Sequence, residues 1–311
     1  MVEVYFLNVG HGDCSIIKHD SGRITMIDIN NTDSYDKESM GELLESFNLR
    51  QTSILWDPMH GLREKGYGIQ PTNPIEFFKE NFQNENIFRY IQSHPDLDHM
   101  RGLGELSKAG ISIINFWDTE NERSIEEEMT EYDKESWEKY QEYRSSEGGS
   151  GVLRLYRGSK GIYYNQEPEG IPPGDGWQIL SPTEEIVKAA NDAQKWNNLS
   201  YVLRLSYKGK RIIFAGDAEE EVWDDLVDQY DSDLKCDVLK ASHHGRDTGY
   251  HAEAVKRMNP EYTIVSVGKK PENDASNKYR HYSKNVWSTR WKGNIKVTIN
   301  DSGNLSISSE G

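Results

Sequence analysis

Residues 93–100 read SHPDLDHM and place four potential metal ligands, His94, Asp96, Asp98 and His99, within six positions. The run IFRYIQS before them predicts a strand, and RGLGELSKAG after them predicts a helix. One carboxylate would be enough to cap that helix, which leaves the other three groups without a role. Imidazole together with carboxylate is a typical donor set for zinc, iron or manganese. The segment therefore predicts a metal-binding loop at the end of a strand.

Two further predicted strands end in the same kinds of side chain. RIIFAGDAEEE runs through an Ala-Gly pair onto Asp217, and DVLKASHHG ends on His243 and His244. Taken alone, Asp217 is better explained as a helix cap than as a metal ligand. Three strands that end in ligand-type residues are more specific, because the ends of several strands can gather at one edge of a fold. This pattern favours a shared metal site.

The order of apolar runs predicts an α/β fold with two β-sheets covered by helices. Residues 2–9, 14–18 and 24–29 predict an N-terminal β-meander, and 200–217 predicts a hairpin with its turn at Lys208–Gly209. Two stretches interrupt this order and are interpreted as insertions in one domain spanning 1–311. The first, at about 31–86, is polar with helices expected at 38–47 and 74–82. The second, at about 118–176, is acidic and carries a predicted helix at 124–143, either a solvated face or a lid over the site.

The net charge of −16 argues against a broad electrostatic grip on a nucleic-acid backbone, which depends on Lys and Arg side chains. It does not exclude a nuclease, because a bound dication dominates the local field and can still attract a phosphate.

The chain shows no targeting or membrane signal. The N-terminus MVEVYFLNVGHGD has no basic region followed by an apolar stretch, and no run reaches the roughly 18 apolar residues of a membrane span. The two cysteines, Cys14 and Cys236, lie in or beside apolar runs and predict buried free thiols. A cytoplasmic location without membrane association is the expectation.

The motifs taken together resemble the metallo-β-lactamase superfamily. NVGHGDCSII, SHPDLDHMRGL, NNLSYVLRLSYKGKRIIFAGDAE, LKASHHG and YRHY occur in the order seen in its branch that includes the nuclease domain of the ComEC/Rec2 DNA-uptake proteins. The resemblance touches roughly 1–30, 87–105 and 177–290. It implies a four-layer αββα sandwich with two mixed sheets flanked by helices. It leaves the substrate open, because one fold can host hydrolysis of several kinds of bond.

The resemblance also implies how the ligands divide between two metal positions. His94 and Asp96 would hold a first ion, Asp98 and His99 a second, and Asp217 would bridge them. His243, in preference to His244, would complete the second position, and Asn197 or Asn198 would occupy the place of the superfamily's third motif.

One letter departs from the superfamily pattern: Asp96 stands where a second histidine is usual. With Asn197 or Asn198 in place of another imidazole, the first position is rich in oxygen, which shifts the preference from zinc towards manganese or towards partial occupancy. We expect one or two divalent ions, zinc or manganese, and hydrolysis by a metal-activated hydroxide.

Other residues enter through the resemblance. Asp98 and His281 are predicted catalytic residues, with His281 binding the leaving group or a substrate oxyanion; an exposed loop histidine is the alternative. Lys278 and Arg280 are its expected phosphate partners. Asp13 in VGHGD is expected to hold a ligand loop by hydrogen bonds, unless it belongs to a simple polar turn.

The leading functional prediction is a phosphodiesterase or nuclease acting on a phosphate ester, in nucleic acid or in a nucleotide. A phosphorylcholine-type or other ester hydrolase with the same site is the first alternative. The second is a non-catalytic, metal-stabilised binding or regulatory module, with a protein partner on the acidic insertion. The oligomeric state stays open, since the terminal hairpin at 294–309 is either a dimer contact or a plain sheet edge.

Overall fold

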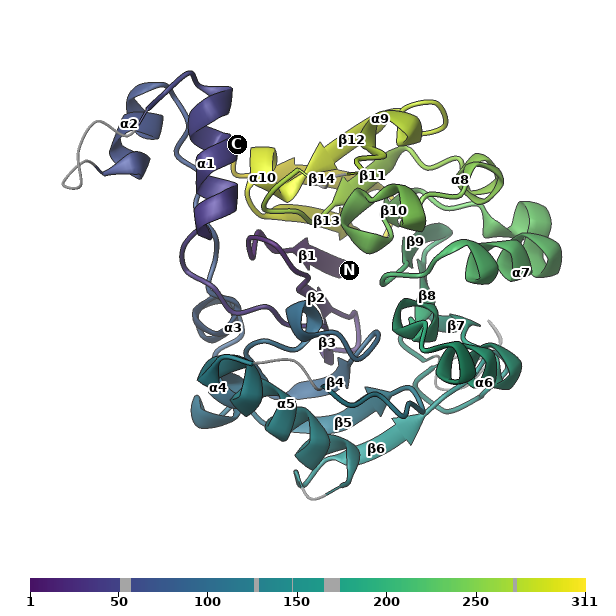
Figure 1. The fold of residues 1–311 in the computed structure, drawn as a ribbon. Coiled ribbons are helices and arrows are strands. Elements are labelled where there is room, and N and C mark those ends of the chain that lie inside the picture. The colour runs from purple at the N-terminus through teal and green to yellow at the C-terminus, as the bar shows by residue number, and fades with distance from the viewer. Residues whose placement is uncertain (51–56, 126–128, 147, 165–173, 271–272) are drawn as a thin grey trace.

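The computed structural model describes residues 1–50, 57–125, 129–146, 148–164, 174–270 and 273–311, and within them two β-sheets face each other (Figure 1). The eight-stranded first sheet collects both ends of the chain. Its strands, in spatial order, are β14 (Leu305–Ser309), β13 (Ile295–Ile299), β1 (Val2–Phe6), β2 (Ser15–Lys18), β3 (Ile24–Ile27), β4 (Ile87–Ile91), β5 (Ile113–Asp118) and β6 (Gly151–Arg154).

The second sheet has six strands among the described residues and is built from the later part of the chain. Its order is β12 (Asn285–Ser288), β11 (Tyr262–Val265), β10 (Val238–Lys240), β9 (Lys210–Phe214), β8 (Val202–Tyr207) and β7 (Trp177–Ser181). The strands β9 to β12 run parallel, whereas β7, β8 and β9 are antiparallel. Both sheets are therefore mixed.

The main apolar core lies between the two sheets. Phe6 on β1 and Phe214 on β9 stack with ring centroids 5.7 Å apart, and Val4, Leu203 and Ile212 are fully buried in the same cluster. The alternating burial along β1 shows why a β-meander forms there, since every second side chain enters this core.

Helices cover the outer faces of both sheets (Figure 1). Three helices pack on the first sheet: α3 (Pro74–Asn81) through Phe78, α4 (Leu103–Lys108) through Leu103 and α5 (Glu131–Arg144) through Tyr140. Two helices pack on the second sheet: α7 (Glu220–Tyr230) through Val222 and α8 (Ala252–Met258) through Val255. The predicted αββα four-layer sandwich is thus confirmed. The remaining helices are α1 (Lys37–Ser46), α2 (Pro58–Glu64), α6 (Glu184–Ala193), α9 (Ser276–Tyr279) and α10 (Thr289–Lys292).

The predicted elements match closely outside the insertions. The meander forms β1, β2 and β3, the hairpin turns at Lys208–Gly209 between β8 and β9, and the terminal hairpin forms β13 and β14. Since β13 pairs with β1, the outer edge of this hairpin is β14. Cys14 and Cys236 are buried free thiols, as expected.

Inside the first insertion, α1 and α3 confirm the helices expected at 38–47 and 74–82, but α2 was missed. The sequence PMHGLRE buries only Gly61 and Leu62, too little for an apolar period, and Asp57 caps this helix through its side chain.

The helix predicted at 124–143 occupies 131–144 instead, and part of the predicted range, 126–128, lies outside the described residues. Thr130 caps the helix with its hydroxyl, which fixes the later start. Asp133, Ser136, Tyr140 and Tyr143 are buried along one face, so α5 packs on the sheet.

None of the helices in the described part of the chain combines the length and the apolar character that crossing a bilayer requires.

A buried histidine links the two sheets at their rim. His19, which follows β2, lies with its Nε2 atom 3.3 Å from the indole nitrogen of Trp177 on β7 and 2.8 Å from the Thr25 hydroxyl. The indole N–H can only donate, so His19 Nε2 must accept. Burial lowers the pKa of His19 to about 3, which keeps this acceptor neutral.

This contact predicts an acid-sensitive step in stability. Because the folded pKa lies below that of the unfolded chain, the stabilisation is complete above about pH 6.5 and is lost as the pH falls towards 3. Between pH 7 and pH 4.5, the free energy of unfolding should fall by about 1–3 kcal/mol less in the His19→Asn variant than in the wild type. Urea unfolding at both pH values measures this difference. His60→Asn, on the exposed face of α2, is the matched control, and an equal pH dependence in His19→Asn would contradict the expectation.

Candidate metal centre

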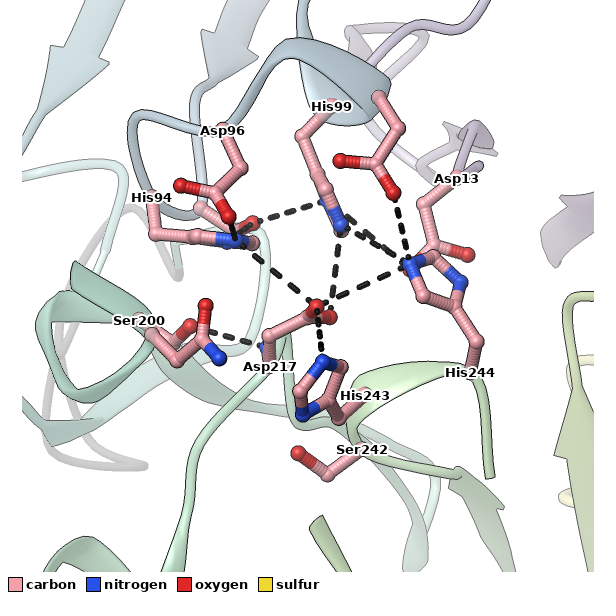
Figure 2. A network of polar contacts seen from close by, with 12 residues as sticks. Asp13, His94, Asp96, His99, Ser200, Asp217, Ser242, His243 and His244 are labelled. Atoms are coloured by element: carbon pink, nitrogen blue, oxygen red, sulfur yellow. Dashed lines mark hydrogen bonds and ion pairs between the residues drawn. The ribbon is translucent and has the colours of Figure 1, made fainter. Parts of the chain in front are cut away.

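The carboxylate of Asp217 lies at the centre of four imidazole rings (Figure 2). The Nε2 atom of each ring faces it. The distances from Nε2 to the nearer carboxylate oxygen are 3.8 Å for His94, 3.4 Å for His99, 3.8 Å for His243 and 3.7 Å for His244. The strand ends that sequence analysis singled out are therefore brought together around one residue.

Each imidazole is oriented by a contact at its other nitrogen. A carbonyl or carboxylate oxygen can only accept, so the Nδ1–H groups of His99 and His244 donate and their Nε2 atoms are left facing the cluster. The four Nδ1 contacts are His94 to Ser93 Oγ at 3.0 Å, His99 to Asp28 Oδ2 at 2.7 Å, His243 to Thr248 Oγ1 at 2.7 Å, and His244 to the Ser266 carbonyl at 3.1 Å. Such outer contacts are typical of metal-ligating histidines.

Asp28 is the most connected of these outer groups. It accepts hydrogen bonds from the Ser93 amide at 2.7 Å and the Ser93 hydroxyl at 2.6 Å in addition to its contact with His99. It follows β3, whereas Ser93 and His99 follow the neighbouring parallel strand β4. Asp28 thus fixes the ligand loop to the sheet.

The loop that carries His243 and His244 has an unusual backbone. His243, His244 and Gly245 have φ values of 49°, 51° and 77°, three successive residues in the left-handed region. A Cβ atom at Gly245 would lie 2.8 Å from the Val265 side chain, so only glycine fits there. Two histidines held in this region store backbone strain, which is typical of functional sites.

Two carboxylates and two imidazoles, with Asp217 among them, form a compact cluster. The Nε2 atom of His244 lies 3.3 Å from Asp98 Oδ2 and 3.3 Å from His99 Nε2. Ligand atoms of Asp13, His99, Asp217 and His244 all lie within 4.8 Å of one another, and all four residues are buried. This group could hold one divalent ion with a nitrogen and oxygen donor set.

Asp13 reaches the cluster from the turn after β1 and also meets Lys240 at the end of β10. The Lys240 Nζ to Asp13 Oδ2 distance is 2.8 Å, and both side chains are almost fully buried. Burial raises the pKa of the Asp13 carboxyl, but Lys240, His244 and His99 together outweigh it and the net shift is downward. Asp13 therefore carries a charge into the site and joins the two sheets there.

The electrostatics of the cluster favour a cation. Burial opposes charge on every member, yet the Asp217 and Asp28 carboxylates raise the pKa of His99 well above its usual value. Asp217 and Asp13 likewise raise the pKa of His244 against the effect of burial. Conversely, His99 and His244 overcome burial and hold the pKa of Asp217 well below its usual range. The same negative field would favour a divalent ion.

His94 and Asp96 lie on the other side of Asp217 (Figure 2). The His94 Nε2 atom is 3.7 Å from Asp96 Oδ2, while Asp96 Oδ1 forms an ion pair with Arg123. Burial, together with the nearby His99, lowers the pKa of His94 to about 4, so its ring is a neutral donor near pH 7. These atoms could form a second metal position.

Unsatisfied atoms support this fit. Among the described residues, His94 Nε2 and Asp217 Oδ1 are buried and have no hydrogen-bond partner. Buried polar atoms are normally paired, and both of these are metal-ligand atoms that face the same space. The residues present therefore fit one or two divalent ions.

The structure brings seven of the predicted ligands together and places the other candidates differently. The seven are His94, Asp96, Asp98, His99, Asp217, His243 and His244. The Asn197 amide donates to Glu219 at 3.1 Å, and Asn198 donates to Glu221 and accepts from the Glu219 amide. Both asparagines thus hold the start of α7, and their part in metal binding stays a prediction.

His281 is exposed just after α9, and its described ring contact is with Tyr282. Lys278 forms an ion pair with Asp247 at 2.9 Å. No contact among the described residues joins His281 to the Asp217 cluster, so its catalytic role also stays a prediction.

The two adjacent histidines occupy different places. His244 contacts Asp98 and His99, whereas the described contacts of His243 are with Asp217, Glu219, Thr248 and Arg246. The expectation placed His243 before His244 at the second position, but the geometry favours His244. The left-handed backbone at both residues turns consecutive side chains to different sides, which a sequence pattern does not reveal.

Sequence reasoning missed three residues around the site: Asp28, Lys240 and Arg246. A signal existed for the first two, because Asp28 interrupts the apolar run ITMIDI and Lys240 interrupts the apolar strand DVLKAS. Arg246 directly follows the two histidines and Gly245, and its guanidinium lies 3.2 Å from His243 Nε2.

Comparison with known proteins supports the resemblance seen in the motifs. The chain is 29% identical over 134 residues to ComE operon protein 3 of Bacillus subtilis (strain 168), and 28% identical over 128 residues to competence protein ComA of Neisseria gonorrhoeae. These stretches cover 43% and 41% of this chain but only 16% and 17% of the relatives. The chain thus spans less than a fifth of either relative, and the ComEC/Rec2-like resemblance is confirmed for the matched part. No protein-family model matches the chain.

Two solved structures are similar over most of the chain. The metallo-β-lactamase fold protein YhfI from Bacillus subtilis matches with a TM-score of 0.46 and 9% identity, covering 99% of this chain and 100% of that one. A mutant of the β-hydroxylase CmlA matches with a TM-score of 0.48 and 9% identity, covering 94% of this chain and 53% of that one.

The cluster predicts metal binding that depends on Asp217. Addition of Zn²⁺ or Mn²⁺ to metal-free protein should raise its stability, by about 2.7 kcal/mol at a free concentration one hundred times the dissociation constant. Asp217→Ala should lose most of this gain, because it removes the carboxylate shared by all four imidazoles. Thermal unfolding and isothermal titration measure both effects. Asp224→Ala, an exposed aspartate on α7, should behave as wild type, and metal affinity unchanged in Asp217→Ala would count against the site.

The two histidines give a separate expectation. His244→Ala should remove the ion held with Asp98 and His99, whereas His243→Ala should retain it. Metal stoichiometry from elemental analysis of the dialysed proteins distinguishes the two variants. Equal loss in both, or loss in His243→Ala alone, would reverse the assignment of His244.

Proposed function

We propose that this protein is a metal-dependent hydrolase that cleaves phosphodiester bonds, in nucleic acid or in a nucleotide. The observation that carries the proposal is the convergence of four imidazole Nε2 atoms on the buried Asp217 carboxylate. The Nδ1 contacts already fix the orientation of these imidazole rings, which leaves their Nε2 atoms available to bind a cation beside Asp217.

The residues divide the work. Asp98, His99 and His244 would hold one ion, His94 and Asp96 would contribute to a second, and Asp217 would serve both. Divalent ions bound in such a site lower the pKa of water and neutralise the charge that develops during phosphoryl transfer. Asp28 and the Ser266 carbonyl keep His99 and His244 in the ring orientation that binding requires.

Two considerations favour a phosphodiester. The donor set includes three carboxylates in addition to the four imidazoles, and a mixed oxygen and nitrogen site can hold manganese as well as zinc, both of which support phosphoryl transfer. The sequence similarity is to a competence protein and to a protein of the ComE operon. Neither name states a substrate, so the choice of a phosphodiester is our proposal. The zinc or manganese identity of the ion is part of the proposal.

The test is a substrate panel with metal-loaded protein. Single- and double-stranded DNA and RNA, cyclic dinucleotides and bis-p-nitrophenyl phosphate probe phosphodiesters, and p-nitrophenyl phosphorylcholine probes the alternative ester substrate. We expect turnover of at least one phosphodiester with Mn²⁺ or Zn²⁺. Turnover of phosphorylcholine alone would favour the other ester hydrolase, and no turnover with metal bound would favour a non-catalytic module.

Asp98 gives the sharpest variant for this activity. Asp98→Ala should lower kcat/KM by more than about 100-fold, the upper end of the cost of losing a residue that only orients a ligand. Asp192→Ala, exposed on α6, is the control with the same substitution. Wild-type activity in Asp98→Ala would contradict the proposed role.

A further inference from the structure

Two arginines reach the candidate metal centre from separate parts of the chain. Arg246 follows the ligand loop, and its guanidinium nitrogens lie 3.2 Å from His243 Nε2 and 3.4 Å from His11 Nε2. Arg123 comes from the acidic insertion and forms an ion pair with Asp96. Each arginine side chain therefore contacts a candidate ligand residue, His243 or Asp96.

The surroundings of Arg246 are unusual for an arginine in this protein. Within the described part of the chain, Arg246 has no carboxylate partner, and its polar side-chain contacts are two imidazoles. Other poorly exposed arginines do have carboxylate partners: Arg89 pairs with Asp175, and Arg290 pairs with Glu42.

A chain with a net charge of −16 offers many carboxylates for pairing, so a half-buried guanidinium without one stands out. Neutral imidazoles satisfy hydrogen bonds but do not balance the charge. An imidazole is either neutral or positively charged, so neither His243 nor His11 can supply the missing negative charge. The missing counter-charge at Arg246 would come from a bound anion.

The backbone holds Arg246 close to the site. Its amide donates to the His243 carbonyl at 2.9 Å, which closes a tight turn directly after the strained ligand residues. It also forms an isolated β-bridge with Asp274. The position of the guanidinium is thus set by the same loop that places His243 and His244.

Arg123 is positioned by α5. Asn121, two residues earlier, accepts from the Arg144 guanidinium at 3.0 Å and donates to the Tyr140 hydroxyl at 2.8 Å. The Tyr140 hydroxyl in turn donates to Asp118 at 2.7 Å. This buried network ties the segment before α5 to the end of β5, and it gives the acidic insertion a defined contact with the site.

We propose that Arg246 and Arg123 bind the non-bridging oxygens of a substrate phosphate and select anionic phosphodiesters over uncharged esters. The inference rests on the proposed function and adds the recognition of the phosphate to it. Guanidinium groups suit this role, because they present paired N–H donors that match phosphate oxygens. An acidic surface would otherwise repel such a substrate, so local positive charge beside the ions is needed for its approach.

The experiment compares Arg246→Gln, Arg246→Lys and Arg123→Gln with the wild type, all loaded with Mn²⁺. Two properties are measured: kcat/KM for bis-p-nitrophenyl phosphate, and the affinity for inorganic phosphate by isothermal titration. Arg63→Gln, exposed on α2, is the matched control. Metal content is determined for every protein, so that a damaged ion site is recognised separately.

We expect Arg246→Gln to weaken phosphate binding and lower kcat/KM by about 10- to 100-fold, mainly through KM, with metal content unchanged. Arg246→Lys should recover part of this loss, since it keeps the charge without the planar fork. Arg123→Gln should show a loss of the same kind. Hydrolysis of the uncharged ester p-nitrophenyl acetate, relative to the phosphodiester, should rise in both Gln variants.

The outcomes separate the two proposals. Absence of phosphodiester turnover by the metal-loaded wild type would overturn the proposed function. Phosphodiester turnover by the wild type with unchanged KM and phosphate affinity in both Gln variants would overturn the inference and leave the proposed function standing.

Discussion

The accumulation of negative charge between the two sheets is the constraint on which the site depends. Asp13, Asp28 and Asp217 are buried around His99, with the partly exposed Asp98 beside His244, and isolated buried carboxylates are costly. Lys240 balances part of this charge through Asp13, and His99 and His244 balance part of the rest. The arrangement requires strand ends from both sheets, so the packing of the sheets and the charge balance of the centre determine each other.

Much of the fold and of the ligand set could be predicted from the sequence because both follow local rules. Alternating apolar residues mark β1, and apolar runs that stop at His94, Asp217 and His243 mark where strands end. The parallel neighbours β9 and β10 bring Asp217 and His243 to one edge of the second sheet, whereas His94 follows β4 in the first sheet and joins them only when the sheets pack. The place of Asp96, where a histidine is usual, came from the resemblance to the metallo-β-lactamase superfamily and not from local rules.

The remaining features depend on tertiary contacts that no local pattern encodes. Asp28 finds His99 only when β3 and β4 are adjacent, and Lys240 finds Asp13 only when the two sheets pack. The choice between His243 and His244 depends on backbone torsions in the left-handed region. The start of α5 depends on the Thr130 cap, which is hard to recognise in the sequence because the acidic residues on both sides of it also fit a helix.

The pairing of β1 with β13 sets an order of assembly. Val2 lies opposite Ile299, so the first sheet stays incomplete until nearly the whole chain is present. Contacts of such long sequence separation form slowly, because a large loop must close before they contribute. Asp13, which follows β1, reaches Lys240 only after the sheets have packed. A partly folded chain therefore lacks the complete centre, and metal binding at this centre would report that folding has finished.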